Sequence, residues 1–149
     1  MQILVDADSC PVKQEIRTAA KEAGIPVVLI TDTSHLLADG YSTVVTVDTA
    51  KDSADFKLLS LTNPGDVVVT QDYGVAAMVL GKGALALHPS GLVYTEGNID
   101  QLLLERHLGQ KLRRAGKRTP NPRKRTAADN QAFVEALRKI LAKNNPVSG

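Results

Sequence analysis

Tryptophan is absent from this sequence of 149 residues, and aromatic residues make up only 3% of it. Valine, leucine, isoleucine and alanine therefore supply nearly all of the apolar volume, a composition typical of parallel strands covered by helices on both faces. Because the hydrophobic fraction is 43%, the chain can bury one core but is too short for two comfortable ones. The composition favours a single α/β domain over an all-β sandwich.

Cysteine is nearly absent as well. Cys10 is the only one, which excludes an internal disulfide and a cysteine-rich zinc site and is typical of a reducing compartment. No uncharged apolar run reaches about 18 residues, and no cationic stretch followed by an apolar run opens the chain, so neither a membrane span nor export is indicated. We expect a cytoplasmic protein with no membrane partner. A helix start after Cys10 could make its thiol reactive, but without a nearby histidine a small buried side chain is the preferred interpretation.

The formal charge of +2 hides an uneven distribution. Residues 1–100 hold 6 Lys/Arg and 13 Asp/Glu, a charge of −7, whereas residues 101–149 hold 12 and 3, a charge of +9. The basic part contains a run without any carboxylate, and its cations are Arg106, Lys111, Arg113, Arg114, Lys117, Arg118, Arg123, Lys124 and Arg125. Such clustering attracts a polyanion, most commonly nucleic acid. Because the run has no aromatic residue, we expect contacts to phosphates rather than stacking on bases.

Short apolar runs alternate with helical patterns over the first hundred residues. Strands are predicted at 2–5, 27–30, 42–47, 67–70 and 84–87, with 92–95 pairing antiparallel or at the sheet edge. Helices are predicted at 12–23, at 56–61 after a stretch that resembles a capping box, Asp52–Asp55, and at 75–80. Two more are predicted from 99 to about 114 after an Asn98 cap, and at 131–143 after the capping box Thr126–Asp129. The pattern predicts an α/β fold with three α/β/α layers and a mostly parallel central sheet. Residues 1–149 form one domain in this interpretation, with a basic helical segment at about 98–143.

Aspartates follow the predicted parallel strands at the point where each strand ends. Right-handed crossovers place all of these strand ends along one edge, where open α/β sheets bind ligands. The residues concerned are Asp6, Asp8, Asp32, Asp48, Asp52, Asp55 and Asp72. Crowded carboxylates repel one another, and a divalent cation relieves that repulsion. Oxygen ligands suit the hard ions Mg²⁺ and Mn²⁺, and a metal beside a phosphate-binding segment indicates phosphodiester hydrolysis.

An ordinary structural role competes with this interpretation. Aspartate after a strand commonly caps a helix or forms an Asx turn, and any one of these residues alone is more often a cap than a ligand. Asp32, Asp52 and Asp55 are the most open to that explanation. Asp6 and Asp8 share one short turn and Asp72 repeats their position on another strand, which favours a site built from these three.

Five stretches carry a resemblance to a known family. They are VDADSCPVK (5–13), DSADFKL (52–58), GDVVVTQDYGVAAM (65–78), NIDQLLLERH (98–107) and KLRRAGKRT (111–119). Together they resemble the bacterial YaiI/YqxD family over nearly the whole chain. That family is largely uncharacterised and is grouped with PIN-domain-like proteins, whose members include metal-dependent nucleases acting on RNA or on flap DNA.

This resemblance implies a PIN-like α/β/α fold and an acidic site. Residue by residue it extends to Asp6 and Asp8 in the first motif, to Asp52 and Asp55 in the second and to Asp72 in the third. A PIN site often includes a glutamate, and none lies in these three motifs. The expected function is a Mg²⁺- or Mn²⁺-dependent nuclease, with RNA the favoured substrate. Its catalytic residues would be Asp6, Asp8, Asp72 and Asp55, and Asp52 would join them as a metal ligand.

Three other functions compete. The non-enzymatic one is a nucleic-acid-binding module with a degenerate metal site, in which the basic run supplies the affinity. A haloacid-dehalogenase-type phosphatase would use the Asp6–Asp8 pair as nucleophile and acid/base, but Cys10 stands where Thr or Val is usual and no acidic pair closes the pattern. A receiver-like phospho-acceptor would need a lysine before Pro89, where this sequence has His88.

Overall fold

The computed structural model of this protein describes residues 1–32, 38–48, 53–116 and 124–144. Its strands are β1 (Ile3–Asp6), β2 (Val27–Asp32), β3 (Thr43–Val47), β4 (Val67–Val69), β5 (Leu85–Leu87) and β6 (Val93–Tyr94). Its helices are η1 (Ala7–Ser9, a 3₁₀ turn), α1 (Lys13–Ala23), α2 (Ala54–Leu61), α3 (Tyr73–Gly81), α4 (Glu96–Arg114) and α5 (Ala127–Asn144). Each predicted strand and helix is present, with bounds shifted by a few residues at most.

The strands form one sheet in the order β3-β2-β1-β4-β5-β6. All neighbouring strands are parallel except β5 and β6, which pair antiparallel. Antiparallel pairing was one of the two arrangements predicted for residues 92–95. From β1 the chain adds β2 and β3 on one side and then returns to place β4 on the other. The order therefore reverses between β1 and β4, and this topological switch point is where open α/β sheets form a ligand-binding crevice.

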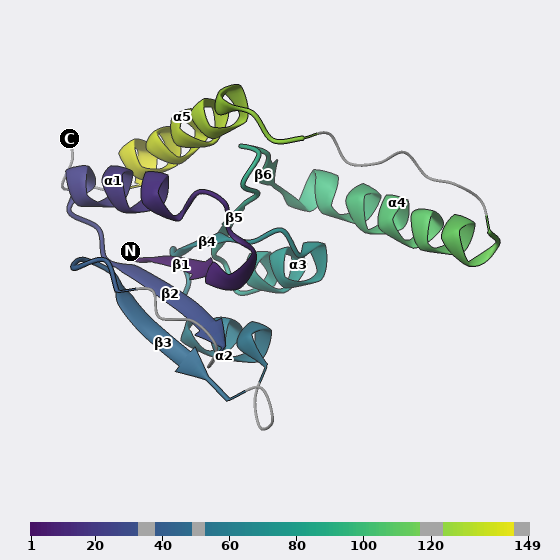
Figure 1. The fold of residues 1–149 in the computed structure, drawn as a ribbon, viewed down its shortest axis with the longest axis horizontal. Helices are drawn as coiled ribbons and strands as arrows, with labels where there is room; N and C mark the ends of the chain where they lie inside the picture. Colours follow the sequence, from purple (N-terminus) through teal and green to yellow (C-terminus); the bar gives the residue numbers. More distant parts are fainter. Residues whose placement is uncertain (33–37, 49–52, 117–123, 145–149) are drawn as a thin grey trace.

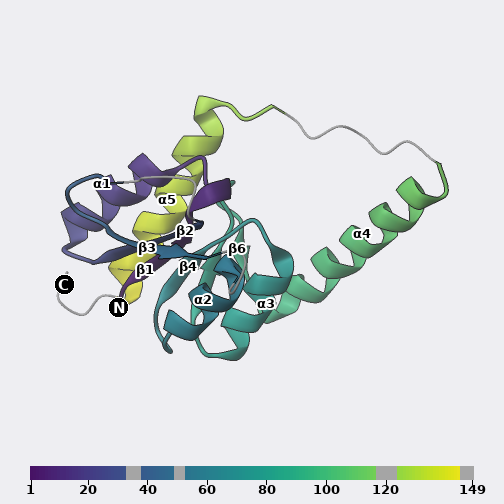
Figure 2. The same ribbon diagram turned by 60° about the horizontal axis from the view of Figure 1, so that its bottom comes forward.

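Helices cover both faces of the sheet. On one face α1 and α5 pack with β1, β2 and β4 through a core that includes Ile16 and Leu137; on the other, α2, α3 and the first half of α4 pack through Leu58 and Val79. Figure 1 shows α1 and α5 on one side of the strands, with α2 and α3 on the opposite side. The predicted three-layer α/β/α fold is confirmed. Figure 2 shows that α4 leaves this body and extends away from it.

Two helix caps differ from the sequence prediction. The N-cap of α4 is Thr95, whose hydroxyl accepts the backbone N–H of Asn98 while the Asn98 side chain accepts the backbone N–H of Thr95. Asn98 is thus the third helical residue of a capping box and not the cap. Similarly, α2 is capped by Ser53, which accepts the N–H of Phe56 at 3.0 Å. Asp55 therefore lies in the first turn of α2 without serving in its cap.

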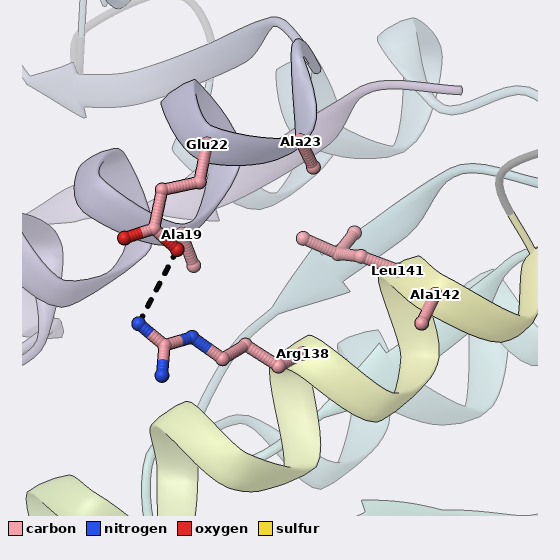
Figure 3. A pocket seen from close by; sticks show the side chains of 6 residues that line it. All are labelled: Ala19, Glu22, Ala23, Arg138, Leu141 and Ala142. Atoms are coloured by element: carbon pink, nitrogen blue, oxygen red, sulfur yellow. Dashed lines mark hydrogen bonds and ion pairs between the residues drawn. The ribbon is translucent and has the colours of Figure 1, made fainter. Parts of the chain in front are cut away.

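A shallow pocket of about 190 Å³ lies between α1 and α5. Figure 3 shows Glu22 and Arg138 pointing toward one another across it, with Nη2 and Oε2 3.3 Å apart. Ala19, Ala23, Leu141 and Ala142 complete the lining. The pocket is formed by the helices and does not belong to the aspartate edge of the sheet. Among the described helices, none is long and apolar enough to cross a membrane.

Candidate functional site

The two aspartates expected to define the site flank the switch point of the sheet. Asp6 ends β1, and Asp72 follows β4 as the N-cap of α3. Strands β1 and β4 are hydrogen-bonded parallel neighbours, with Val5 in register with Val69. Because adjacent parallel strands end side by side, both carboxylates lie at the carboxyl edge of the same strand pair. The spatial relationship on which the sequence argument depended is therefore present.

Four of the predicted aspartates lie near enough to one another at this edge to interact through their charges. Burial raises the pKa of Asp6, and the neighbouring charge of Asp55 raises it further, with smaller contributions from Asp8 and Asp72. The hydroxyl of Ser9, 3.4 Å from Oδ2 of Asp6, acts in the opposite direction. Burial also raises the pKa of Asp55, and the charge of Asp72 adds to this shift. Carboxylates from β1, η1, α2 and the cap of α3 thus repel one another at one edge.

Asp72 combines a structural role with this position. Its Oδ1 accepts the backbone N–H groups of Gly74 at 2.8 Å and Val75 at 3.2 Å. The carboxylate therefore caps α3, as the ordinary structural interpretation required. A helix N-terminus also stabilises the negative charge on Asp72. Capping fixes the position of this carboxylate at the switch point, so the two roles are compatible.

Asp8 is held by the neighbouring strand. Its Oδ1 accepts the hydroxyl of Thr31 at 2.5 Å, and its Oδ2 accepts the backbone N–H of Asp32 at 2.9 Å. Both carboxylate oxygens thus connect η1 to the end of β2. Asp32 lies at the end of β2 and Asp48 directly after β3, farther from the switch point along the same edge. Asp52 lies outside the described residues.

The donor chemistry suits a hard cation, but the described carboxylates do not form a ready ligand set. Oxygen ligands of this kind bind Mg²⁺ and Mn²⁺. However, no group of three or more His, Cys, Asp or Glu side chains within residues 1–32, 38–48, 53–116 and 124–144 is arranged to hold a metal ion. The four carboxylates are near enough to raise the pKa of Asp6 without converging on one point. Metal binding at this edge would require their side chains to move together.

One basic residue of α4 reaches the acidic edge. Nη1 of Arg106 lies 3.5 Å from Oδ1 of Asp72. We predicted Arg106 to bind nucleic acid as part of the basic run, and its pairing with a candidate site residue had no signal in the sequence. The pair adds a positive charge to an edge otherwise dominated by carboxylates, and it joins the acidic and basic parts of the chain.

The other predicted nucleic-acid-binding residues fall into three groups. Lys111, Arg113 and Arg114 are exposed on the last turns of α4, and Lys124 is exposed before α5. Arg125 is half-buried and donates to the carbonyl of Pro89 at 2.6 Å and to Oδ1 of Asn130 at 2.7 Å, so its guanidinium holds the start of α5 against the chain after β5. Lys117, Arg118 and Arg123 lie outside the described residues.

Comparison with known proteins decides the family. The family model described as "Uncharacterized BCR, YaiI/YqxD family" matches residues 4–143. The chain belongs to the YaiI/YqxD family. A UPF0178 protein of Ruminiclostridium cellulolyticum is 64% identical over 137 residues, covering 92% of this chain and 90% of the relative. UPF0178 proteins of Lachnoclostridium phytofermentans and Clostridium kluyveri are 52% and 48% identical over 144 and 149 residues, covering 95% and 100% of this chain and 97% and 98% of the relatives. No solved structure matches.

Beside the acidic edge, this YaiI/YqxD protein carries a ring cluster that we did not predict. The ring centroids of Tyr73 and Tyr94 are 5.9 Å apart, and His88 lies 6.1 Å from Tyr94 and 6.5 Å from Tyr73. Burial raises the pKa of Tyr94, and its hydroxyl donates to the carbonyl of Thr70. Burial and the charge of Arg125 lower the pKa of His88. The only sequence signal was the position of Tyr73 directly after Asp72.

Cys10 is buried, and this burial raises the pKa of its thiol. The expectation of a small buried side chain at this position is confirmed.

Proposed function

We propose that this YaiI/YqxD protein is a divalent-metal-dependent nuclease that hydrolyses phosphodiester bonds, with RNA as its preferred substrate. The observation that carries the proposal is the placement of Asp6 and Asp72 at the ends of the neighbouring parallel strands β1 and β4, with Asp8 and Asp55 near enough to raise the pKa of Asp6. Repelling carboxylates at a ligand-binding edge are stabilised by a cation. The resemblance of the sequence motifs to PIN-like proteins supports the same chemistry.

Each site residue has a proposed role. Asp6 and Asp72 would be the primary ligands of Mg²⁺ or Mn²⁺, because they lie on either side of the switch point. Asp55 would complete the ligand set from α2, where Ser53 leaves it outside the helix cap. Asp8 would contribute less directly, since both of its oxygens already accept hydrogen bonds. The bound ion would polarise the phosphodiester and supply hydroxide near neutral pH.

Cations of the chain would bind the nucleic-acid backbone. Arg106 is placed beside the acidic edge and would contact the phosphate nearest to the cleaved bond. The exposed cations at the end of α4 and before α5 would hold phosphates farther along the strand. Such contacts carry little sequence information, so cleavage should depend weakly on base identity.

A nucleic-acid-binding module without cleavage is the second candidate. Two observations favour it: the described carboxylates are not arranged as a ligand set, and Arg106 already pairs with Asp72. In this alternative the acidic edge serves to orient α4, and the basic run binds the polyanion without metal.

A titration of Mn²⁺ into the wild type and an Asp6→Asn/Asp72→Asn double variant tests both candidates. Asparagine still caps α3, so the double variant loses charge at the site while keeping the helix start. A Glu22→Gln/Glu135→Gln variant is the matched control, because both carboxylates are exposed, on α1 and α5, away from the acidic edge. We expect metal binding and metal-dependent cleavage of a mixed RNA pool by the wild type and the control only. Equal weak binding by all three proteins would eliminate the metal site, and RNA binding without cleavage would favour the module.

A further inference from the structure

Helix α4 carries an exposed row of leucines. Leu104, Leu108 and Leu112 are 56%, 49% and 44% exposed. A separation of four residues places successive side chains on one face of a helix. Single exposed leucines are common, but three in a row along a helix form a continuous apolar stripe of the kind that marks an interaction surface. We call these three residues the leucine stripe.

The leucine stripe faces away from the body of its own chain. The opposite face of α4 carries Ile99, Leu103 and Arg106, which follow one another at intervals of about one turn. Ile99 is buried against α3 and the sheet. Leu103 packs against the same core, and Arg106 reaches Asp72. Figures 1 and 2 both show α4 extending away from the sheet and the other helices. No described part of the chain beyond α4 lies over the extended half in either view.

Charges beside the stripe change sign along the helix. Glu96 and Asp100 lie on one flank in the first half of α4, and Lys111 and Arg114 lie on the same flank in the second half. The intervals between these residues are 4, 11 and 3 positions, each close to a whole number of helical turns. This flank is therefore acidic near the body and basic near the end of the helix.

We propose that the leucine stripe is a dimer interface at which α4 packs antiparallel against α4 of a second copy of this chain. A two-fold axis passing between Leu104 and Leu108 makes the contact self-complementary. The charged flank of each helix then faces the same flank of the other copy, and the two helices run in opposite directions. This places Asp100 beside Lys111 and Glu96 beside Arg114 of the other copy. Charges on such flanking positions select partner and orientation in paired helices. A parallel pair would instead bring opposite flanks together, so these residues would face the flank that carries Glu105 and the two pairings would be lost.

The arrangement leaves the acidic edge unobstructed. It engages Lys111 and Arg114, so Arg113 and Lys124 are the exposed cations at the end of α4 and before α5 that remain open to phosphates. Each body packs on the face of α4 opposite to the stripe, so the two bodies lie on opposite sides of the helix pair. Arg106 and the acidic edge stay outside the interface because Arg106 lies on the body-facing side of the helix. A nucleic acid has no aliphatic surface to cover these leucines. A second copy places its Leu108 against Leu104 and its Leu104 against Leu108, and it also supplies the matching charges.

Light scattering after size-exclusion chromatography of the full chain tests the interface in the absence of metal and RNA. The monomer mass is 15.9 kDa, and we expect the wild type to approach twice this value as its concentration rises through the micromolar range. Leu108→Glu should weaken dimerisation by more than about tenfold, because it places two carboxylates in an apolar contact. Met78→Glu is the control, since Met78 is an exposed apolar residue on α3 away from the stripe. A wild type that stays monomeric at all concentrations would overturn the proposal.

Charge reversal tests the orientation independently of the leucines. Asp100→Lys and Lys111→Asp alone should each weaken the dimer, and the combined variant should restore it, because the reversed residues again face opposite charges. Circular dichroism melting confirms that each variant is folded. A combined variant weaker than both single variants would rule out the antiparallel arrangement. Loss of nuclease activity would not affect these masses, so failure of this proposal and failure of the proposed function are separate results.

Discussion

Nη1 of Arg106 lies 3.5 Å from Oδ1 of Asp72 at the edge where β1 and β4 end. This ion pair joins the basic helix α4 to the acidic site. The contact fixes which side of α4 faces the carboxylates. It also gives the site one cation of its own, which competes with any metal for Asp72. The strength of metal binding and the contact with a polyanion are therefore linked through one guanidinium.

Removal of the Arg106 charge should change the affinity for the metal and the affinity for RNA in opposite directions. We expect Arg106→Gln to tighten Mn²⁺ binding by up to about fivefold, because an exposed ion pair contributes ~0.2–1 kcal/mol, and to weaken RNA binding. Isothermal titration calorimetry with each ligand measures the two effects. Arg113→Gln, two turns farther along α4, should weaken RNA binding while leaving Mn²⁺ affinity unchanged. Equal Mn²⁺ affinities of wild type and Arg106→Gln would contradict competition at Asp72.

The raised pKa of Asp6 predicts how the stability of the metal-free protein depends on pH. The folded state holds the proton on Asp6 more tightly than the unfolded chain does, so stability falls as pH rises through the ordinary aspartate range and the cost is fully present at neutral pH. Asp6→Asn removes this cost, and we expect its Tm near pH 7 to exceed that of the wild type by about 2 °C.

Calorimetry on the same proteins provides the controls. Below about pH 3 the difference should vanish, since the carboxyl is then protonated in both states. Glu135→Gln, which removes an exposed carboxylate on α5 far from the acidic edge, is the control for a change of net charge alone. Addition of Mn²⁺ should stabilise the wild type more than Asp6→Asn, because only binding to the folded state raises Tm. A lower Tm of Asp6→Asn at neutral pH would contradict the repulsion at the site.

The hydrogen bond from Thr31 to the carboxylate of Asp8 should contribute more to stability than a hydrogen bond from a buried hydroxyl to a neutral carbonyl. Thr31 is fully buried and donates to a carboxylate, so Thr31→Val should cost about 1.5–3 kcal/mol in the free energy of unfolding. Thr62 is also buried but donates to the neutral carbonyl of Leu58, and Thr62→Val should cost only about 0.5–1.5 kcal/mol. Urea denaturation of both variants checks the order. A larger loss for Thr62→Val would show that the Asp8 contact has little energetic weight.

Exposed cations of the basic run should contribute to RNA binding, whereas a cation that is hydrogen-bonded within the protein should not. We expect Arg113→Gln and Lys124→Gln each to reduce the slope of log K against log salt by about one, since each removes a phosphate contact. Arg125→Gln should leave this slope unchanged and lower Tm, because Arg125 donates to Pro89 and Asn130 within the protein. Filter binding at several salt concentrations, together with thermal melts, separates the two behaviours. A reduced slope for Arg125→Gln would place its side chain on the phosphate backbone.

Local sequence patterns predict the strands and helices of this protein and the residues that end them. Apolar runs such as 67–70 and helix starts such as Thr126–Asp129 depend on neighbours within a few positions, so period and capping chemistry predict them. The parallel order of strands and helices also predicted that Asp6 and Asp72 would share an edge. Ser53 and Thr95 were missed as caps because several polar residues precede each helix and only the path of the backbone selects among them.

Which of these residues meet depends on the packing of helices and strands that are far apart in the chain. The sequence contains no local signal that α4 turns Arg106 toward Asp72, that Thr31 engages Asp8, or that Arg125 binds the chain after β5. Each contact joins segments far apart in the chain, and its existence depends on how the helices pack on the sheet. Local propensities act over one or two turns, whereas packing selects one arrangement of the whole core. The composition of the acidic edge was therefore readable in the sequence, and its pairing with a cation was not.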